Sequence, residues 1–225
     1  MMSAFLYEIF MKAFVITIKD HEKSEQVADR CIRSAKDYGL DVVKFDAITP
    51  KDDILDICNR EVIAISRFQG VYSRLENSLS AFLSHYSLWK NCVQQKEPFV
   101  IFEHDAVVNS PIPKTLPKYV GNIGKPSYGK FNIPSSGWGR LTSKPYFPGA
   151  HAYIVTPEGA QRLIDAAPLH AMTTDVYLSR ERFDWLEEHY PWSAEAQDTF
   201  TTIQNFTGCL AKHNYDSNYQ IENVS

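Results

Sequence analysis

The chain alternates between unbroken apolar runs and segments with helical spacing. Residues 13–18 form an apolar, β-branched run bounded by charged residues, which is typical of a strand buried on both faces of a sheet. Residues 22–38 then place apolar side chains at helical intervals and stop at Gly39, a common helix terminator. A second strand-like run follows at 41–45. A strand, a helix and a strand in this order predict a βαβ unit.

The strongest helical pattern covers residues 75–95. Its apolar stripe consists of Leu75, Leu79, Phe82, Leu83, Tyr86, Trp89 and Val93. An apolar strand follows at 99–102, another at 151–156, and Pro157 stands where a helix would begin. We therefore predict an α/β fold with a central, mostly parallel sheet flanked by helices.

Composition excludes several classes of protein. A net charge of −4 and 44% hydrophobic residues over 225 residues argue against a disordered chain. The apolar stretches fall short of the roughly 20 residues that a spanning helix needs. The four cysteines are Cys31, Cys58, Cys92 and Cys209. Because no two of them form a CxxC pair, we expect reduced thiols and a cytoplasmic protein. Residues 1–12 are expected to be an extension before a single domain over 13–225.

Residues 106–157 differ in composition from the rest of the chain. They contain no Asp or Glu, six Lys or Arg and six of the ten glycines, with aromatic residues interleaved. A connection this long without strong periodicity is usually functional or mobile. We predict a basic loop region rich in Gly, Pro and aromatic residues over 106–150. Its composition suits contact with phosphates, membrane headgroups or nucleic acid.

Two acidic residues end the strand at 99–102. Glu103 and Asp105 lie where the chain leaves the carboxyl end of a buried strand, the usual ligand position in open α/β sheets. Two carboxylates at this spacing can bind one Mg²⁺ or Mn²⁺ ion together with substrate phosphates. A solvated acidic turn is the alternative, and the pair alone leaves both interpretations open.

The context of this pair resembles a known family. Ser84, His85 and Trp89 on a helix, followed by an apolar strand and the triplet Glu103-His104-Asp105, resemble glycosyltransferase family 25, the lipopolysaccharide-biosynthesis and collagen-galactosyltransferase type. Three further segments occur in the family's order: the strand at 15–18, Phe45-Asp46-Ala47, and the block at 148–160. The resemblance covers about residues 13–205.

The resemblance implies a GT-A-like nucleotide-sugar-binding fold and inverting transfer from a nucleotide-sugar donor, with a UDP-sugar favoured. It implies an Mn²⁺ or Mg²⁺ cofactor on Glu103 and Asp105. His104 occupies the middle position, where the family usually has Asp, and is either a ligand or structural. The donor-binding residues that we carry over are Thr17, Ile18, Lys19, Asp46, Ala47, Ser84 and His85. The acceptor-side candidates are Trp138, Gly149 and His151.

An inverting displacement needs one general base on the acceptor hydroxyl. Asp175 stands where the family places an aspartate, and it is our candidate for the base, with Asp184 second. A helix N-cap is the alternative role for Asp175. His213 is a further candidate metal ligand.

The sequence is compatible with three functions. The first is transfer to a saccharide of lipopolysaccharide type. The second is transfer to a hydroxymethylated DNA base, which would stack on the aromatic residues of the basic region. The third is a relative that binds a nucleotide sugar without catalysis. Salt distinguishes the first two, because DNA binding through several phosphates weakens steeply as salt rises.

Overall fold

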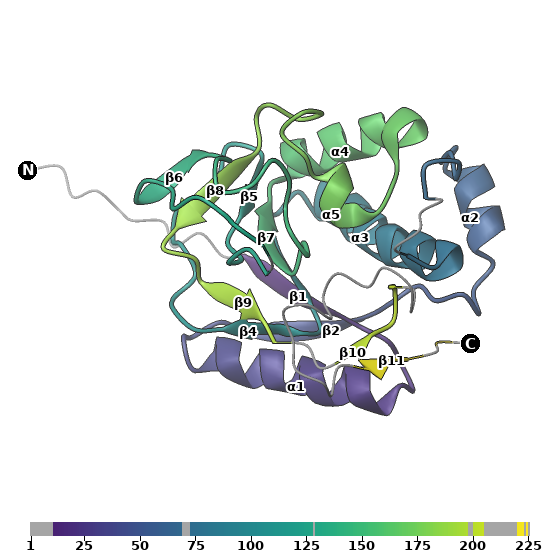
Figure 1. Cartoon of the computed structure of the whole chain (residues 1–225), viewed down its shortest axis with the longest axis horizontal. Helices are drawn as coiled ribbons and strands as arrows, with labels where there is room; N and C mark the ends of the chain where they lie inside the picture. Colours follow the sequence, from purple (N-terminus) through teal and green to yellow (C-terminus); the bar gives the residue numbers. More distant parts are fainter. Residues whose placement is uncertain are drawn as a thin grey trace, which may run out of the picture.

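A computed structural model describes residues 11–68, 73–127, 129–197, 200–204, 220–222 and 224 of the chain (Figure 1). One central sheet organises these residues, with helices packed on both of its faces. The predicted α/β fold with a helix-flanked central sheet is therefore confirmed.

The central sheet has seven strands in the order β2-β1-β3-β7-β5-β8-β6. Their bounds are β1 Lys12–Thr17, β2 Val42–Asp46, β3 Phe99–Glu103, β5 Val120–Asn122, β6 Gly137–Arg140, β7 Ala152–Val155 and β8 Glu187–Tyr190. Strands β2, β1 and β3 are parallel. Strand β7 runs antiparallel to β3 and β5, while β8 is parallel to β5 and antiparallel to β6. The sheet is thus parallel in its first part and mixed overall.

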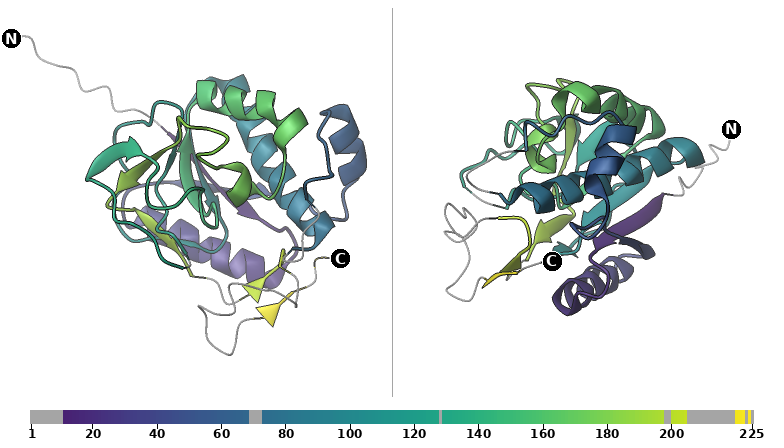
Figure 2. Two further views of the ribbon diagram at one scale, coloured as in Figure 1. Left: turned by 45° about the horizontal axis from the view of Figure 1, so that its top comes forward. Right: turned by 90° about the vertical axis from the view of Figure 1, so that its right-hand side faces the viewer.

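Helix α1, Glu22–Lys36, covers one face of the sheet, and α3, Leu75–Gln95, and α4, Pro157–His170, cover the other (Figures 1 and 2). Side-chain alternation along the strands explains this arrangement. On β3, Val100 and Phe102 pack with the α1 side, whereas Phe99 and Ile101 pack with α3 and α4. A strand buried on both faces in this way must be apolar throughout, as the sequence indicated. Two shorter helices are α2, Ile54–Arg60, and α5, Thr174–Tyr177.

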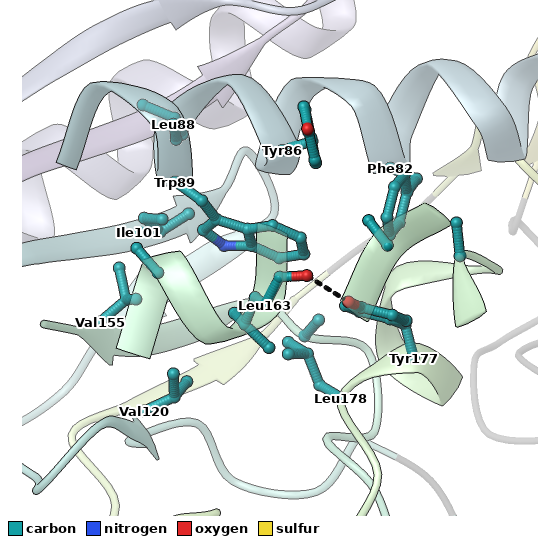
Figure 3. Close-up of a cluster of buried hydrophobic side chains, with 14 of the residues drawn as sticks. Phe82, Tyr86, Leu88, Trp89, Ile101, Val120, Val155, Leu163, Tyr177 and Leu178 are labelled. Atoms are coloured by element: carbon teal, nitrogen blue, oxygen red, sulfur yellow. Dashed lines mark hydrogen bonds between the residues drawn. The ribbon is translucent and has the colours of Figure 1, made fainter. Parts of the chain in front are cut away.

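The core beneath α3 is aromatic (Figure 3). Trp89 is fully buried and donates a hydrogen bond from Nε1 to the Tyr153 hydroxyl at 2.9 Å. Tyr177 of α5 stacks on Trp89 with ring centroids 5.7 Å apart, and its hydroxyl donates to the Leu163 carbonyl. Each buried polar atom of these rings therefore has a partner, as burial of polar groups requires.

The segment 106–150, expected to be a loop region, contributes three short strands. Besides β5 and β6 these include β4, Ala106–Val108, which pairs with β9, Ala194–Ala196. Strands of three or four residues are too short to produce a clear sequence period, which explains why composition alone suggested a loop. Near the C-terminal end, β10, Phe200–Thr201, pairs in parallel with β11, Gln220–Ile221.

Cys31, Cys58 and Cys92 are buried free thiols, while Cys209 and residues 1–10 lie outside the described residues. In the described part of the chain, we find no helix that is long and apolar enough to cross a membrane.

Candidate functional site

A small pocket lies at the edge of the sheet where the parallel strands β1, β2 and β3 end. Its volume is about 70 Å³. We call it the edge pocket; it is lined by Ile16, Ile18, Ala47, Ile48, Thr49, Pro50, Asn77, Ser80, Ala81, Ser84, His85, Glu103, His104, Thr202, Ile203 and Val224. This is the position at which open α/β sheets bind ligands.

Ser84 fixes one side of the edge pocket. Its Oγ accepts a hydrogen bond from the Ile48 backbone N–H at 2.9 Å and donates to the Ser80 carbonyl one turn earlier on α3. The Ala47 N–H donates to the Thr17 carbonyl at 2.8 Å. The segment after β2 is therefore held against both α3 and β1, and Ser84 shapes the pocket by positioning backbone.

Glu103 is oriented by a chain of buried polar groups. His85 Nε2 lies 3.1 Å from Glu103 Oε1, and His85 Nδ1 lies 2.8 Å from the Tyr153 hydroxyl. Burial lowers the pKa of His85 to about 3, while the charge of Asp175 opposes this shift. His85 is therefore neutral near pH 7 and makes a hydrogen bond to Glu103, not an ion pair.

One arrangement of protons satisfies the whole chain. The Trp89 N–H donates to the Tyr153 oxygen, so the Tyr153 O–H is available for His85 Nδ1. His85 then carries its proton on Nε2 and donates it to the Glu103 carboxylate. The fully buried imidazole thus fixes a carboxylate whose side chain keeps 26% of its surface exposed. Buried side chains of the core therefore hold the carboxylate of the pocket in position.

His104 lines the pocket but is anchored to α1. Its Nδ1 lies 2.7 Å from the Ser24 hydroxyl, which also accepts from the Ile18 N–H at 2.9 Å. Burial, together with the positive charges of His21 and Arg30, lowers the pKa of His104 to about 4. One ring nitrogen of His104 thus has a structural partner, which leaves Nε2 as its only possible ligand atom.

The chain turns after Glu103, and Asp105 does not line the edge pocket. The pKa of the Cys31 thiol on α1 is raised, mainly by burial and secondly by the negative charge of Asp105. Arg30 Nη2 also donates to the Asp105 carbonyl at 3.3 Å. Asp105 therefore lies outside the pocket lining that contains Glu103, and a cation shared by both carboxylates stays a prediction. Within the described residues, no three His, Cys, Asp or Glu side chains are grouped closely enough to hold a metal ion by themselves.

Of the predicted donor residues, Ile18, Ala47, Ser84 and His85 line the edge pocket. The other three do not: Thr17 is buried with its hydroxyl on the Val15 carbonyl, and Lys19 and Asp46 lie beyond or at the ends of their strands, outside the pocket lining. Pocket residues that we did not predict from sequence include Asn77 and Ser80. A signal for them existed, because Asn77, Ser80, Ala81 and Ser84 form a small or polar stripe at helical spacing.

Asp175 lies in the first turn of α5, where its Oδ1 accepts from the Val176 N–H at 2.8 Å. Thr173 occupies the N-cap position, and its hydroxyl lies 3.2 Å from Ser78 Oγ on α3. This contact docks α5 near the end of α3 that borders the edge pocket. The negative charge of Asp175 is close enough to His85 to raise its pKa, which opposes part of the lowering that burial causes. Asp184 is exposed and does not line the pocket.

None of the three acceptor candidates lines the edge pocket. Trp138 lies on the outermost strand, where its Nε1 donates to the Thr115 carbonyl at 2.9 Å. Gly149 adopts a φ of 86° beside Ser127. His151 is only 2% exposed, and its ring packs on Gly124. The metal candidate His213 lies outside the described residues.

The C-terminal residues form one wall of the pocket through Thr202, Ile203 and Val224. Arg74 holds this wall twice, since its N–H donates to the Ile203 carbonyl at 2.8 Å and its Nη2 to the Glu222 carbonyl at 2.7 Å. Lys23 of α1 pairs with the Glu222 carboxylate. Besides these polar contacts, the buried ring of Phe200 next to the wall lies against His21 and His104.

Buried histidines predict a loss of stability in acid. Burial lowers the pKa of His85 to about 3, and burial is also the first cause that lowers the pKa of His104 and of His151 to about 4. In the unfolded chain a histidine has a pKa of about 6.5, so below that pH the unfolded state binds more protons than the folded state. The free energy of unfolding should therefore be highest above pH 6.5 and fall toward pH 4, by up to about 1.4 kcal/mol per pH unit for each histidine.

Urea unfolding at pH 7, 6 and 5 measures this slope. The variant His151→Gln should have a smaller dependence of the free energy of unfolding on pH. The reason is that the unfolded variant no longer binds a proton at position 151. An unchanged pH dependence in His151→Gln would show that the His151 imidazole binds its proton in the folded protein over the same pH range as in the unfolded chain.

The sequence model of glycosyltransferase family 25 (LPS biosynthesis protein) matches residues 10–129, more than half of the chain. The matched region contains β1, β3, Ser84, His85 and Glu103, and ends before β7 and Asp175. No curated protein matches the chain.

Proposed function

The chain belongs to glycosyltransferase family 25, and we propose that it transfers a hexose or similar sugar from a UDP-sugar to a hydroxyl of a saccharide of lipopolysaccharide type. The observation that carries this proposal is the position of Glu103. Glu103 is the last residue of the buried parallel strand β3. Its carboxylate lines the edge pocket and is oriented by neutral His85. A fixed carboxylate at this edge of an α/β sheet suits the binding of a metal-associated diphosphate.

The pocket side chains fit a divalent cation that is shared with substrate. Mg²⁺ and Mn²⁺ are usually held by one or two carboxylates, with phosphate oxygens completing the set. Glu103 would supply the carboxylate and His104 Nε2 a second ligand atom, in a pocket that both residues line. The cation, when bound, would supply Lewis-acid stabilisation of the departing nucleotide. His85 and Tyr153 would keep the Glu103 carboxylate in one orientation.

Asp175 is our proposed general base. It lies in the first turn of α5, outside the lining of the edge pocket, and its charge acts on the pocket residue His85. Inverting transfer needs a carboxylate on the acceptor side that removes the hydroxyl proton as the bond to the sugar forms. Glu103 would then serve the donor while Asp175 serves the acceptor.

The pocket volume of about 70 Å³ is smaller than the few hundred Å³ typical of ligand sites. A complete nucleotide sugar would therefore need one wall to shift. The C-terminal wall is the best candidate, because polar contacts from Arg74 and Lys23 hold it in place.

Release of nucleoside diphosphate from a panel of nucleotide sugars tests the proposal. Reactions would contain Mn²⁺, Mg²⁺ or a chelator, with oligosaccharides or hydroxymethylated DNA as acceptors. We expect one UDP-sugar to be consumed only with metal, and faster with a saccharide. Preference for the DNA acceptor would replace the saccharide part of the proposal. Binding of the donor without turnover under any condition would identify a non-catalytic relative.

A further inference from the structure

A second, wider hollow lies on the acid-free part of the chain. Its volume is about 840 Å³. We call it the lysine hollow; its lining includes Lys130, Phe131, Ser143, Lys144 and Tyr146. It combines two cationic side chains with two aromatic rings and a hydroxyl, and no residue between 106 and 157 is acidic.

Two connections between strands line this hollow, and each is joined at one end to the edge of the sheet where Glu103 lies. Strand β7 begins beside the end of β3, since Ala152 pairs with Phe102 and the Glu103 N–H donates to the His151 carbonyl at 3.0 Å. Strand β5 ends beside the start of β7, where Asn122 pairs with Tyr153. The connection from β5 to β6 therefore starts at this edge and the connection from β6 to β7 ends at it, and residues of both connections line the lysine hollow.

The lysine hollow has a built framework. Glu188 of β8 is 1% exposed, and its Oε1 accepts from the Thr142 N–H at 2.6 Å, the Thr142 hydroxyl at 3.0 Å and the Ser143 N–H at 2.8 Å. These three hydrogen bonds fix the backbone that carries Lys144, while Oε2 of Glu188 is buried with no hydrogen-bond partner among the described residues. The Ser143 hydroxyl is buried and has no hydrogen-bond partner among the described residues.

Positive charge is concentrated around this framework. Gly129 has a φ of 68°, and a Cβ added there would lie 3.1 Å from Lys144 Nζ, so the ammonium group lies over this glycine. Arg180 adds a third cation nearby, because its N–H donates to the Pro145 carbonyl at 2.7 Å and its Nη1 to the Leu141 carbonyl at 3.1 Å. Lysine is a common phosphate binder, and aromatic rings offer an apolar face to a sugar.

We propose that the lysine hollow is the acceptor subsite and binds a phosphate group carried by the acceptor saccharide. The inference rests on the proposed transferase function and specifies its acceptor as a phosphorylated sugar. Lys130 and Lys144 hold the phosphate, and the rings of Phe131 and Tyr146 contact the sugar.

Calorimetric titration with glucose 6-phosphate, and with glucose as the uncharged probe, tests this assignment. We expect the full chain to bind the phosphorylated probe more tightly. The double variant Lys130→Gln/Lys144→Gln should weaken that binding at least about tenfold, since each hydrogen bond to a charged group is worth about that factor. The control, Lys114→Gln/Lys118→Gln, removes the same charge from exposed lysines that precede β5, at its opposite end, and should leave the affinity unchanged.

UDP titration of the same variants separates the two proposals. Loss of glucose 6-phosphate binding with unchanged UDP binding supports the lysine hollow. If no UDP-sugar is bound or cleaved but phosphate binding still depends on the two lysines, the hollow stands and the transferase proposal fails. Equal affinity of the Lys130→Gln/Lys144→Gln variant and the unaltered chain would overturn the inference. Tighter, steeply salt-dependent binding of single-stranded DNA than of glucose 6-phosphate would overturn it in favour of a polynucleotide.

Discussion

Replacing Glu103 by Gln should lower metal-dependent release of nucleoside diphosphate by about 100-fold or more. Among the described residues that line the edge pocket, Glu103 carries the only carboxylate. A bound cation contributes several kcal/mol of charge stabilisation in the transition state, and each 1.36 kcal/mol is a factor of ten in rate. Gln keeps the size of Glu, and its carbonyl still accepts the hydrogen bond from His85. The loss should therefore appear in activity and not in folding.

Glu97→Gln is the matched control for this variant. Glu97 precedes β3, at the end opposite Glu103, and forms an exposed ion pair with Lys12 at 2.7 Å. Such a surface pair contributes little to stability, so this variant should retain the full rate. The rates are measured in Mn²⁺ and in chelator, with the melting temperatures of both variants as a check on folding. If a Glu103→Gln protein retained more than half of the Mn²⁺-dependent rate, Glu103 would not be a ligand of the proposed metal site.

The parts of the fold that could be predicted from sequence are those with long, regular patterns. Strand β1 and helices α1 and α3 lie where apolar runs and helical spacing placed them. Strands β5, β6 and β9 were not predicted, because three or four residues carry no reliable period and their pairing partners are distant in sequence. The antiparallel direction of β7 also depends on tertiary pairing that no local pattern records.

The candidate site shows the same division. The acidic end of a buried strand pointed to Glu103, and the family resemblance pointed to Ser84 and His85, which line the same pocket. The charge of Asp105 acts on Cys31 of α1, a neighbour 74 positions earlier in the chain that its spacing from Glu103 did not indicate. The partner of His104 is Ser24, 80 positions earlier in the chain. Long-range contacts of this kind become visible only once the elements are packed.

Replacing Gly159 by Ala should destabilise the protein by about 3 kcal/mol or more, although Ala favours helices over Gly by about 1 kcal/mol. Gly159 lies in the first turn of α4, where its N–H donates to the Thr156 hydroxyl at 3.1 Å. The Thr156 N–H and hydroxyl in turn donate to the Tyr119 carbonyl at 2.9 and 3.1 Å. This network brings α4 so close to the chain before β5 that a Cβ on Gly159 would lie 2.2 Å from the Tyr119 oxygen. Because that oxygen belongs to the backbone, no side-chain rotation can relieve the contact.

The melting temperature should fall by about 6–12 °C in Gly159→Ala, given 2–4 °C per kcal/mol for a chain of this size. Gly139→Ala is the matched control, since a Cβ added at Gly139 would meet no atom of the described residues within 4 Å and its φ is not in the left-handed region. That variant should change stability by no more than about 0.5 kcal/mol. The two melting curves, measured on the full chain, decide the matter. If Gly159→Ala and Gly139→Ala have the same melting temperature, α4 does not approach Tyr119 closely. The packing of α4 against β5 and β7 would then be looser than the structure indicates.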